Sequence, residues 1–220
     1  MSIKTIVINY GSPRSGTTFL SHVFDQLSDS VLAFKLTEAR ILHPCQSEDG
    51  LIELHTLLRK KHVVLVRTVR HPMEVAESFL ALQNPATWPP DAKRPGLANF
   101  TNARFAGFVT RESENTALQR PALLAPDYRH RGLSFIEIRY EDLADGAGQE
   151  EFARLVAEKL PEPDTNFQIL VDALRDYGEN PVGVGRLFAG GGVVEPMGER
   201  ERSWFAARLA GVAEREGYLI

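Results

Sequence analysis

Short runs of apolar residues recur along this chain, separated by segments in which apolar residues return every three or four positions. The short runs predict strands over Lys4–Asn9, Val31–Leu36, His62–Arg67 and Ser134–Ile138. An unbroken apolar run such as His62–Arg67 is typical of a strand buried in a parallel sheet. Strands that alternate with helices predict an α/β fold, in which helices flank a central, mostly parallel sheet.

Helical spacing of apolar residues marks most of the remaining chain. One helix is expected after the first strand as far as Leu27, and Leu51, Leu54, Leu57 and Leu58 mark another. Further helices are expected from Pro72 through Leu80 and over Phe100–Arg120, Gln149–Leu160, Thr165–Tyr177 and Glu199–Glu216. The apolar side of the segment Phe100–Arg120 is expected to carry Phe105, Phe108, Val109 and Leu118. The proline-rich stretch Gln83–Asn99 and the glycine-rich stretch Gly183–Gly192 predict loops.

Length and composition narrow the class of protein. The chain has 220 residues and shows no internal repeat or linker, so we predict a single domain over residues 1–220. A net charge of −4 argues against a general nucleic-acid binder, and a polyanionic ligand would need local basic residues. No window approaches the ~18 consecutive apolar residues of a membrane span, and we expect no leader ahead of the first strand. We therefore expect a cytoplasmic protein. The single cysteine, Cys45, excludes an intramolecular disulfide and a cysteine-based metal cluster.

The segment Tyr10–Leu20 carries the strongest chemical signal. It follows an apolar strand and leads into an amphipathic helix, with Gly11 and Gly16 in the turn between them. Backbone N–H groups and the positive end of the helix dipole both point at such a turn, which makes it a cradle for phosphate. Its spacing is that of a nucleotide-binding P-loop, but Thr17 stands where a P-loop has lysine. The cation lies earlier in the turn, at Arg14.

This loop resembles that of a known enzyme family. The run Pro13-Arg14-Ser15-Gly16-Thr17-Thr18 is similar to the Pro-Lys/Arg-Ser-Gly-Thr-Thr loop of sulfotransferases that use 3′-phosphoadenosine 5′-phosphosulfate (PAPS). In that family the loop holds the 5′-phosphosulfate end of the donor. The resemblance therefore implies a P-loop-like sulfotransferase fold and donor contacts from all six residues of the run.

A second segment follows the strand His62–Arg67. Arg70 stands at the end of this strand, and Ser78 follows eight residues later on the expected helix. By itself, an arginine at this place is often only a surface ion pair. The carboxyl ends of parallel strands are nevertheless where ligands bind in α/β sheets, and a guanidinium can grip phosphate with two hydrogen bonds. The pair resembles the arginine and serine that hold the donor's 3′-phosphate in the sulfotransferase family.

Two further segments extend the resemblance, one of them incompletely. Tyr140-Glu141-Asp142-Leu143 is similar to the family's Tyr-Glu-Asp-Leu signature, which implies that Tyr140 lies against the adenosine of the donor. The alternative is a tyrosine that caps the edge of the sheet. The family's Arg-Lys-Gly segment has its nearest counterpart around Arg186, without the paired lysine. A 3′-phosphate contact from Arg186 is the expectation here.

The implied reaction moves a sulfonate from PAPS to a hydroxyl, less readily an amine, of a small-molecule or lipid-like acceptor. It leaves 3′-phosphoadenosine 5′-phosphate (PAP) and requires no metal. Arg14 is expected to neutralise charge on the leaving phosphate. Glu38 is the first candidate for the base that deprotonates the acceptor, with His43 and His55 as alternatives. Glu38 can equally pair with Lys35 or Arg40.

Two other functions remain open at this point. A P-loop kinase that uses ATP and magnesium needs lysine after Gly16 and a strand that ends in a magnesium-binding aspartate. Thr17 and the strands that end at Asn9, Arg67 and Arg139 fail these requirements. A non-catalytic nucleotide-binding protein would keep the same cradle, and only turnover separates it from an enzyme.

Overall fold

The computed structural model of the protein describes residues 4–12, 14–36, 61–83, 96–125, 132–179 and 197–219. The strands are β1 (Thr5–Gly11), β2 (Val31–Leu36), β3 (His62–Val69) and β4 (Leu133–Arg139). The α-helices are α1 (Thr17–Phe24), α3 (Pro72–Gln83), α4 (Asn102–Leu123), α6 (Gly146–Ala157), α7 (Pro163–Glu179) and α9 (Glu199–Glu216). Two short 3₁₀ helices are η3 (Gly96–Asn99) and η4 (Tyr140–Leu143).

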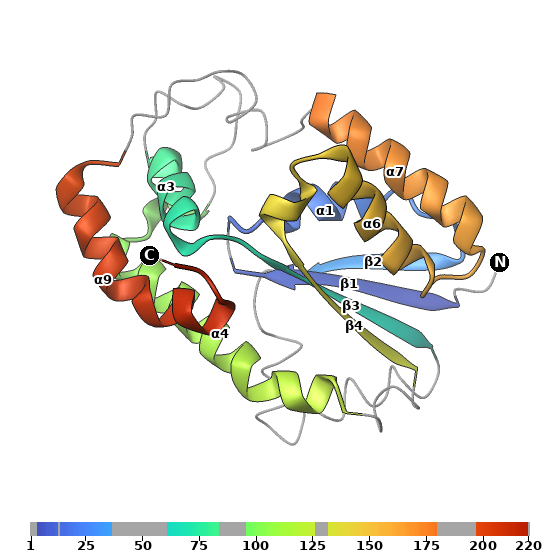
Figure 1. The fold of residues 1–220 in the computed structure, drawn as a ribbon, viewed down its shortest axis with the longest axis horizontal. Coiled ribbons are helices and arrows are strands. Elements are labelled where there is room, and N and C mark those ends of the chain that lie inside the picture. The colour runs from blue at the N-terminus through green and yellow to red at the C-terminus, as the bar shows by residue number, and fades with distance from the viewer. Residues whose placement is uncertain are drawn as a thin grey trace.

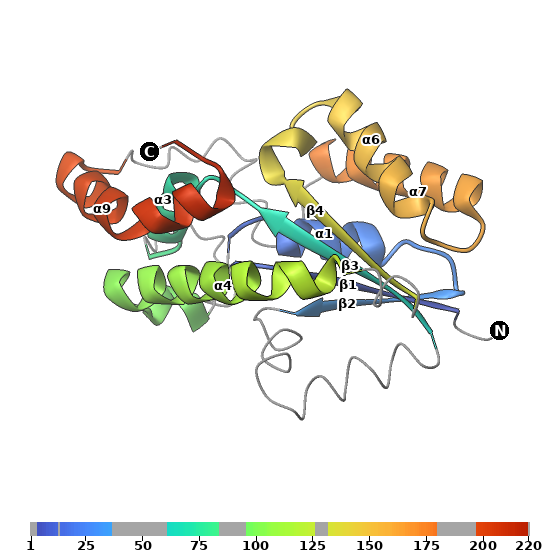
Figure 2. The same cartoon turned by 60° about the horizontal axis from the view of Figure 1, so that its bottom comes forward.

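The four described strands form one parallel sheet in the order β2-β1-β3-β4. Helices lie on both sides of it, with α1, α6 and α7 on one side and α4 on the other (Figures 1 and 2). The predicted α/β fold with a parallel sheet is thus confirmed for this part of the chain. Because β1, β3 and β4 are neighbours, the segments that follow their carboxyl ends meet at one edge of the sheet.

Alternation of side chains along the strands builds two cores. Val7, Val64 and Val66 face α1, α6 and α7 in a cluster that includes Phe24 and Phe152. The opposite face carries Ile6, Ile8, Tyr10, Val63 and Leu65, which pack against Leu123 at the end of α4 and against Leu133. A third cluster joins α3, α4 and α9, where the rings of Phe79 and Phe105 stack at 3.8 Å between centroids. The sheet edge therefore lies on a well-packed scaffold.

Predicted and observed boundaries agree closely for the strands. The second strand and the last helix have the predicted bounds, and β3 extends two residues beyond Arg67. The helix expected around Leu51–Leu58 and the stretch Gly183–Gly192 lie outside the described residues, as does most of Gln83–Asn99. Among the described residues, no helix is both long and apolar enough to cross a membrane.

The expected apolar side of α4 is wrong at Leu118, which is 72% exposed. The second half of the helix turns polar residues inward instead, and Glu112, Ser113, Thr116 and Gln119 are all buried. The polar face of α4 is explained by the buried charge of Arg67. Arg67 on β3 is 2% exposed and needs polar partners from the helix that covers it.

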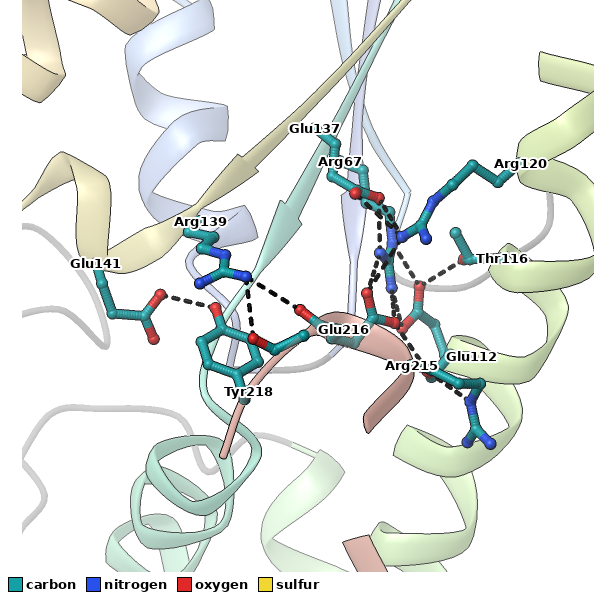
Figure 3. A network of polar contacts seen from close by, with 12 residues as sticks. Arg67, Glu112, Thr116, Arg120, Glu137, Arg139, Glu141, Arg215, Glu216 and Tyr218 are labelled. Atoms are coloured by element: carbon teal, nitrogen blue, oxygen red, sulfur yellow. Dashed lines mark hydrogen bonds and ion pairs between the residues drawn. The ribbon is translucent and has the colours of Figure 1, made fainter. Parts of the chain in front are cut away.

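Arg67 is held by carboxylates from three elements (Figure 3). Its Nη1 and Nη2 donate to the two carboxylate oxygens of Glu216 in α9, both at 2.8 Å, which is a bidentate pair. Nη1 also donates to Glu137 in β4 at 2.9 Å, and Nε donates to Glu112 in α4 at 3.4 Å. Arg120 bridges Glu137 and Glu216 from the outside. The network therefore ties α4 and α9 to the sheet beneath the edge where the predicted site lies.

Candidate functional site

The loop between β1 and α1 makes a tight turn at the carboxyl end of β1. A Cβ atom on Gly11 would lie 2.5 Å from the carbonyl oxygen of Thr68 and 2.7 Å from Oγ of Ser15, so only glycine fits. Arg14 has a positive φ of 72°, which is uncommon for a residue with a side chain. This turn aims the Arg14 side chain across the sheet edge toward α3.

Gly16 joins the loop to the start of α1 and to the segment after β4. It caps α1 with φ 99°, without a side-chain cap and with no acidic residue in the first turn. A Cβ atom here would overlap the ring of Tyr140, so this glycine is also required by the close approach of that ring. A helix N-terminus of this kind, beside a cation, suits an anionic ligand.

Arg14 and Ser78 are in direct contact. Nε of Arg14 donates to Oγ of Ser78 at 2.9 Å, across 64 residues of chain. Arg70 approaches the same loop, because its Nη1 donates to the backbone carbonyl of Arg14 at 3.3 Å. The structure therefore brings together the loop residue, the strand-end arginine and the helix serine that the sequence singled out.

Arg70 also lies on Tyr140. Its guanidinium carbon is 4.7 Å from the centroid of the Tyr140 ring, which is a cation–π contact. Nε of Arg70 donates to Glu74, one turn into α3, at 3.0 Å. The ring of Phe19 lies nearly perpendicular to the same tyrosine ring, with 6.3 Å between the two centroids. All three family-like segments thus converge on one place.

The electrostatics of this place favour an anion. Burial and the neighbouring charge of Arg70 together lower the pKa of Arg14 to about 10. Burial removes water from the charged guanidinium of Arg14, and the guanidinium of Arg70 repels it, so both make the charged form of Arg14 less favourable. A bound phosphate or sulfonate would offset that cost, since it supplies the opposite charge.

The hydroxyl-bearing residues of the loop differ in burial and in the hydrogen bonds that they already make. Ser15 is fully buried, and both its Oγ (2.7 Å) and its N–H (3.2 Å) donate to the carbonyl of Ser12. Its expected contact with the donor is therefore used, in this conformation, to close the turn. Thr17 is buried at the start of α1, and its carbonyl accepts from Nδ2 of Asn9. Thr18 is half-buried on the first turn.

Several predicted site residues lie outside the described residues. These are Pro13 of the loop, the base candidates Glu38, His43 and His55, and the proposed phosphate ligand Arg186. The described part of the site therefore includes most, but not all, of the residues that were predicted to contact the donor. It contains no described carboxylate or histidine that was predicted to act as the base.

The structure adds contacts for residues to which the sequence assigned no role in the site. Glu74 pairs with Arg70, and Glu141 accepts hydrogen bonds from two other segments. Tyr177 at the end of α7 packs on Phe19 with 4.6 Å between ring centroids. Burial and the nearby Tyr140 raise the pKa of Tyr177, while Arg14 acts in the opposite direction. Glu141 belongs to the segment Tyr140–Leu143 that the sequence singled out, but the partners of Glu141 and the contacts of Glu74 and Tyr177 had no local signal.

The chain was compared with known proteins. No protein-family model matches it, and the search of curated proteins finds no match either. Within the described part of the chain, no group of three or more histidine, cysteine, aspartate or glutamate side chains is placed to hold a metal ion.

Proposed function

We propose that this protein is a sulfotransferase that moves a sulfonate group from PAPS to a hydroxyl of a small-molecule or lipid-like acceptor. One observation carries the proposal. Arg14, Ser78, Arg70 and Tyr140 come from three segments that each resemble the family in sequence, and they make contact at one sheet edge. An accidental resemblance in three separate segments would not require those residues to meet.

The described residues fit the two anionic ends of such a donor. The turn at Arg14 and the start of α1, which has no side-chain cap, would hold the 5′-phosphosulfate, and Arg70 with Ser78 would hold the 3′-phosphate. Tyr140 would offer its ring to the nucleoside. PAPS supplies the activated sulfonate, and the protein supplies positive charge where the leaving phosphate becomes more anionic.

A binding experiment tests this function first. We expect adenosine 3′,5′-bisphosphate (PAP) to bind by calorimetry, with ATP plus magnesium giving little heat. Labelled PAPS with a panel of phenols and alcohols then tests turnover. Preference for ATP with magnesium would favour a kinase, while tight binding of PAP without transfer to any acceptor would favour a nucleotide-binding protein.

Arg70→Ala should chiefly weaken donor binding. The variant loses a charged hydrogen bond to the 3′-phosphate, which typically contributes about 1.5–3 kcal/mol, so the Kd for PAP should rise by at least about tenfold. The matched control is Arg175→Ala, which removes an exposed arginine on α7 that is paired with Asp172. Calorimetric titration of both variants with PAP checks the prediction, and wild-type affinity in Arg70→Ala would remove Arg70 from the site.

A further inference from the structure

Glu141 uses both carboxylate oxygens to join segments beside the candidate site. Oε1 accepts the backbone N–H of His71 at 2.7 Å, and Oε2 accepts the hydroxyl of Tyr218 at 2.9 Å. Figure 3 shows the side chain of Glu141 reaching toward Tyr218 near the end of the chain. Glu141 therefore links η4, the start of α3 and the segment after α9.

His71 is the residue through which this link reaches Arg70. It directly follows Arg70 and precedes the first residue of α3, Pro72, which has no N–H. Its Nδ1 accepts the N–H of Met73 at 3.2 Å, and its carbonyl accepts the N–H of Val75 at 3.0 Å. His71 thus caps α3. The bond from its own N–H to Glu141 fixes the backbone between Arg70 and the helix that carries Ser78.

Consecutive residues of η4 hold Arg70 at two points. Tyr140 lies under the guanidinium, and Glu141 fixes the peptide group that follows Arg70. From this arrangement we infer that Glu141 is a positioning residue, which sets the direction of Arg70 toward the 3′-phosphate of the donor. The inference rests on the proposed function, because it assigns Glu141 a role in that same donor site.

The segment after α9 holds Glu141 in place. The guanidinium of Arg139 lies 4.7 Å from the centroid of the Tyr218 ring, and its Nη2 donates to the carbonyl of Gly217 at 3.2 Å. Nε2 of His71 lies 2.9 Å from the carbonyl of Leu219. Burial and the hydrogen bond to Glu141 raise the pKa of Tyr218, so its hydroxyl stays protonated and continues to donate. The carboxylate is thereby kept in the orientation that meets His71.

Comparing the binding of two nucleotides distinguishes a role of Glu141 in positioning Arg70 from a general loss of structure. PAP carries the 3′-phosphate, whereas adenosine 5′-phosphate lacks it and contacts only the loop and nucleoside subsites. Glu141→Ala should raise the Kd for PAP about tenfold and leave the Kd for adenosine 5′-phosphate within about twofold. Glu141→Gln should stay within about threefold for both, because its amide oxygen can still accept the N–H of His71.

The outcomes distinguish this inference from the proposed function. Equal weakening of both nucleotides in Glu141→Ala, or no weakening of either, would overturn the positioning role. Tyr218→Phe releases one oxygen of Glu141 and keeps the other partner, so it should weaken PAP selectively, and it serves as the test if Glu141→Ala does not fold. Wild-type protein that binds PAP no more tightly than adenosine 5′-phosphate would overturn the proposed function itself.

Discussion

Arg14→Ala should lower the rate of sulfonate transfer by about 10²–10³-fold, the typical cost of removing one preorganised donor to a developing oxyanion. Donor affinity should change much less, because in the proposed site Arg70 and Ser78 would still hold the 3′-phosphate. The physical reason is that, in the proposed reaction, Arg14 would act on the leaving phosphate, where charge grows only as the sulfonate leaves. The measurement is kcat with labelled PAPS and an accepted alcohol, beside the Kd for PAP.

A second variant is needed to separate loss of the Arg14 side chain from a change in the backbone of the turn. Its positive φ of 72° is unfavourable for alanine, so Arg14→Ala can disturb the turn as well as remove the guanidinium. Arg14→Gly removes the same side chain and tolerates this conformation. Equal losses of kcat in both variants would assign the effect to the guanidinium. A loss of PAP affinity as large as the loss of kcat would instead mean that Arg14 contributes to ground-state binding.

The residues that meet at the carboxyl ends of β1, β3 and β4 could be singled out from the sequence because each of their segments is local. A turn rich in small residues between a strand and a helix, or an arginine at a strand end, is recognisable from its neighbours alone. Parallel strands then bring their carboxyl ends to one edge, and the order β1-β3-β4 places Arg14, Arg70 and Tyr140 side by side. That order itself had no signal in the sequence.

What could not be predicted depends on contacts between distant residues. Arg67 stood in an apolar run and gave no sign that its partners are Glu112, Glu137 and Glu216, up to 149 residues away. The same network reverses the apparent apolar side of α4 at Leu118. Glu141 follows a recognisable tyrosine, yet its partners His71 and Tyr218 are 70 and 77 residues away. The spacing of apolar residues along a helix predicts its buried face only when that face is apolar, which is not the case for the second half of α4.

Arg67→Met should destabilise the protein by about 3–5 kcal/mol, because removing one partner of a buried ion pair leaves charge uncompensated in the interior. Glu112 and Glu216 are both nearly fully buried against Arg67, with exposed side-chain fractions of 4% and 5%. Denaturant unfolding measures the loss. Arg175→Ala is the surface control and should cost about 0–1 kcal/mol, since its pair with Asp172 is exposed.

The pH dependence of the unfolding free energy should show whether Arg67→Met destabilises the protein through lost charge pairing or through lost packing. Burial alone would raise the pKa of Glu216, but the hydrogen bond and charge of Arg67 outweigh it and lower that pKa. A carboxyl whose folded pKa is lowered contributes stability that is present above its ordinary pKa and lost as the pH falls through the folded value. In Arg67→Met, Glu216 loses the charge that lowers its pKa while its burial remains, so protonation of Glu216 becomes favourable to the folded state. The difference in unfolding free energy between wild type and variant should therefore narrow as the pH falls from 7 through the carboxyl range, whereas a pH-independent difference would show that packing, not charge, makes Arg67 important.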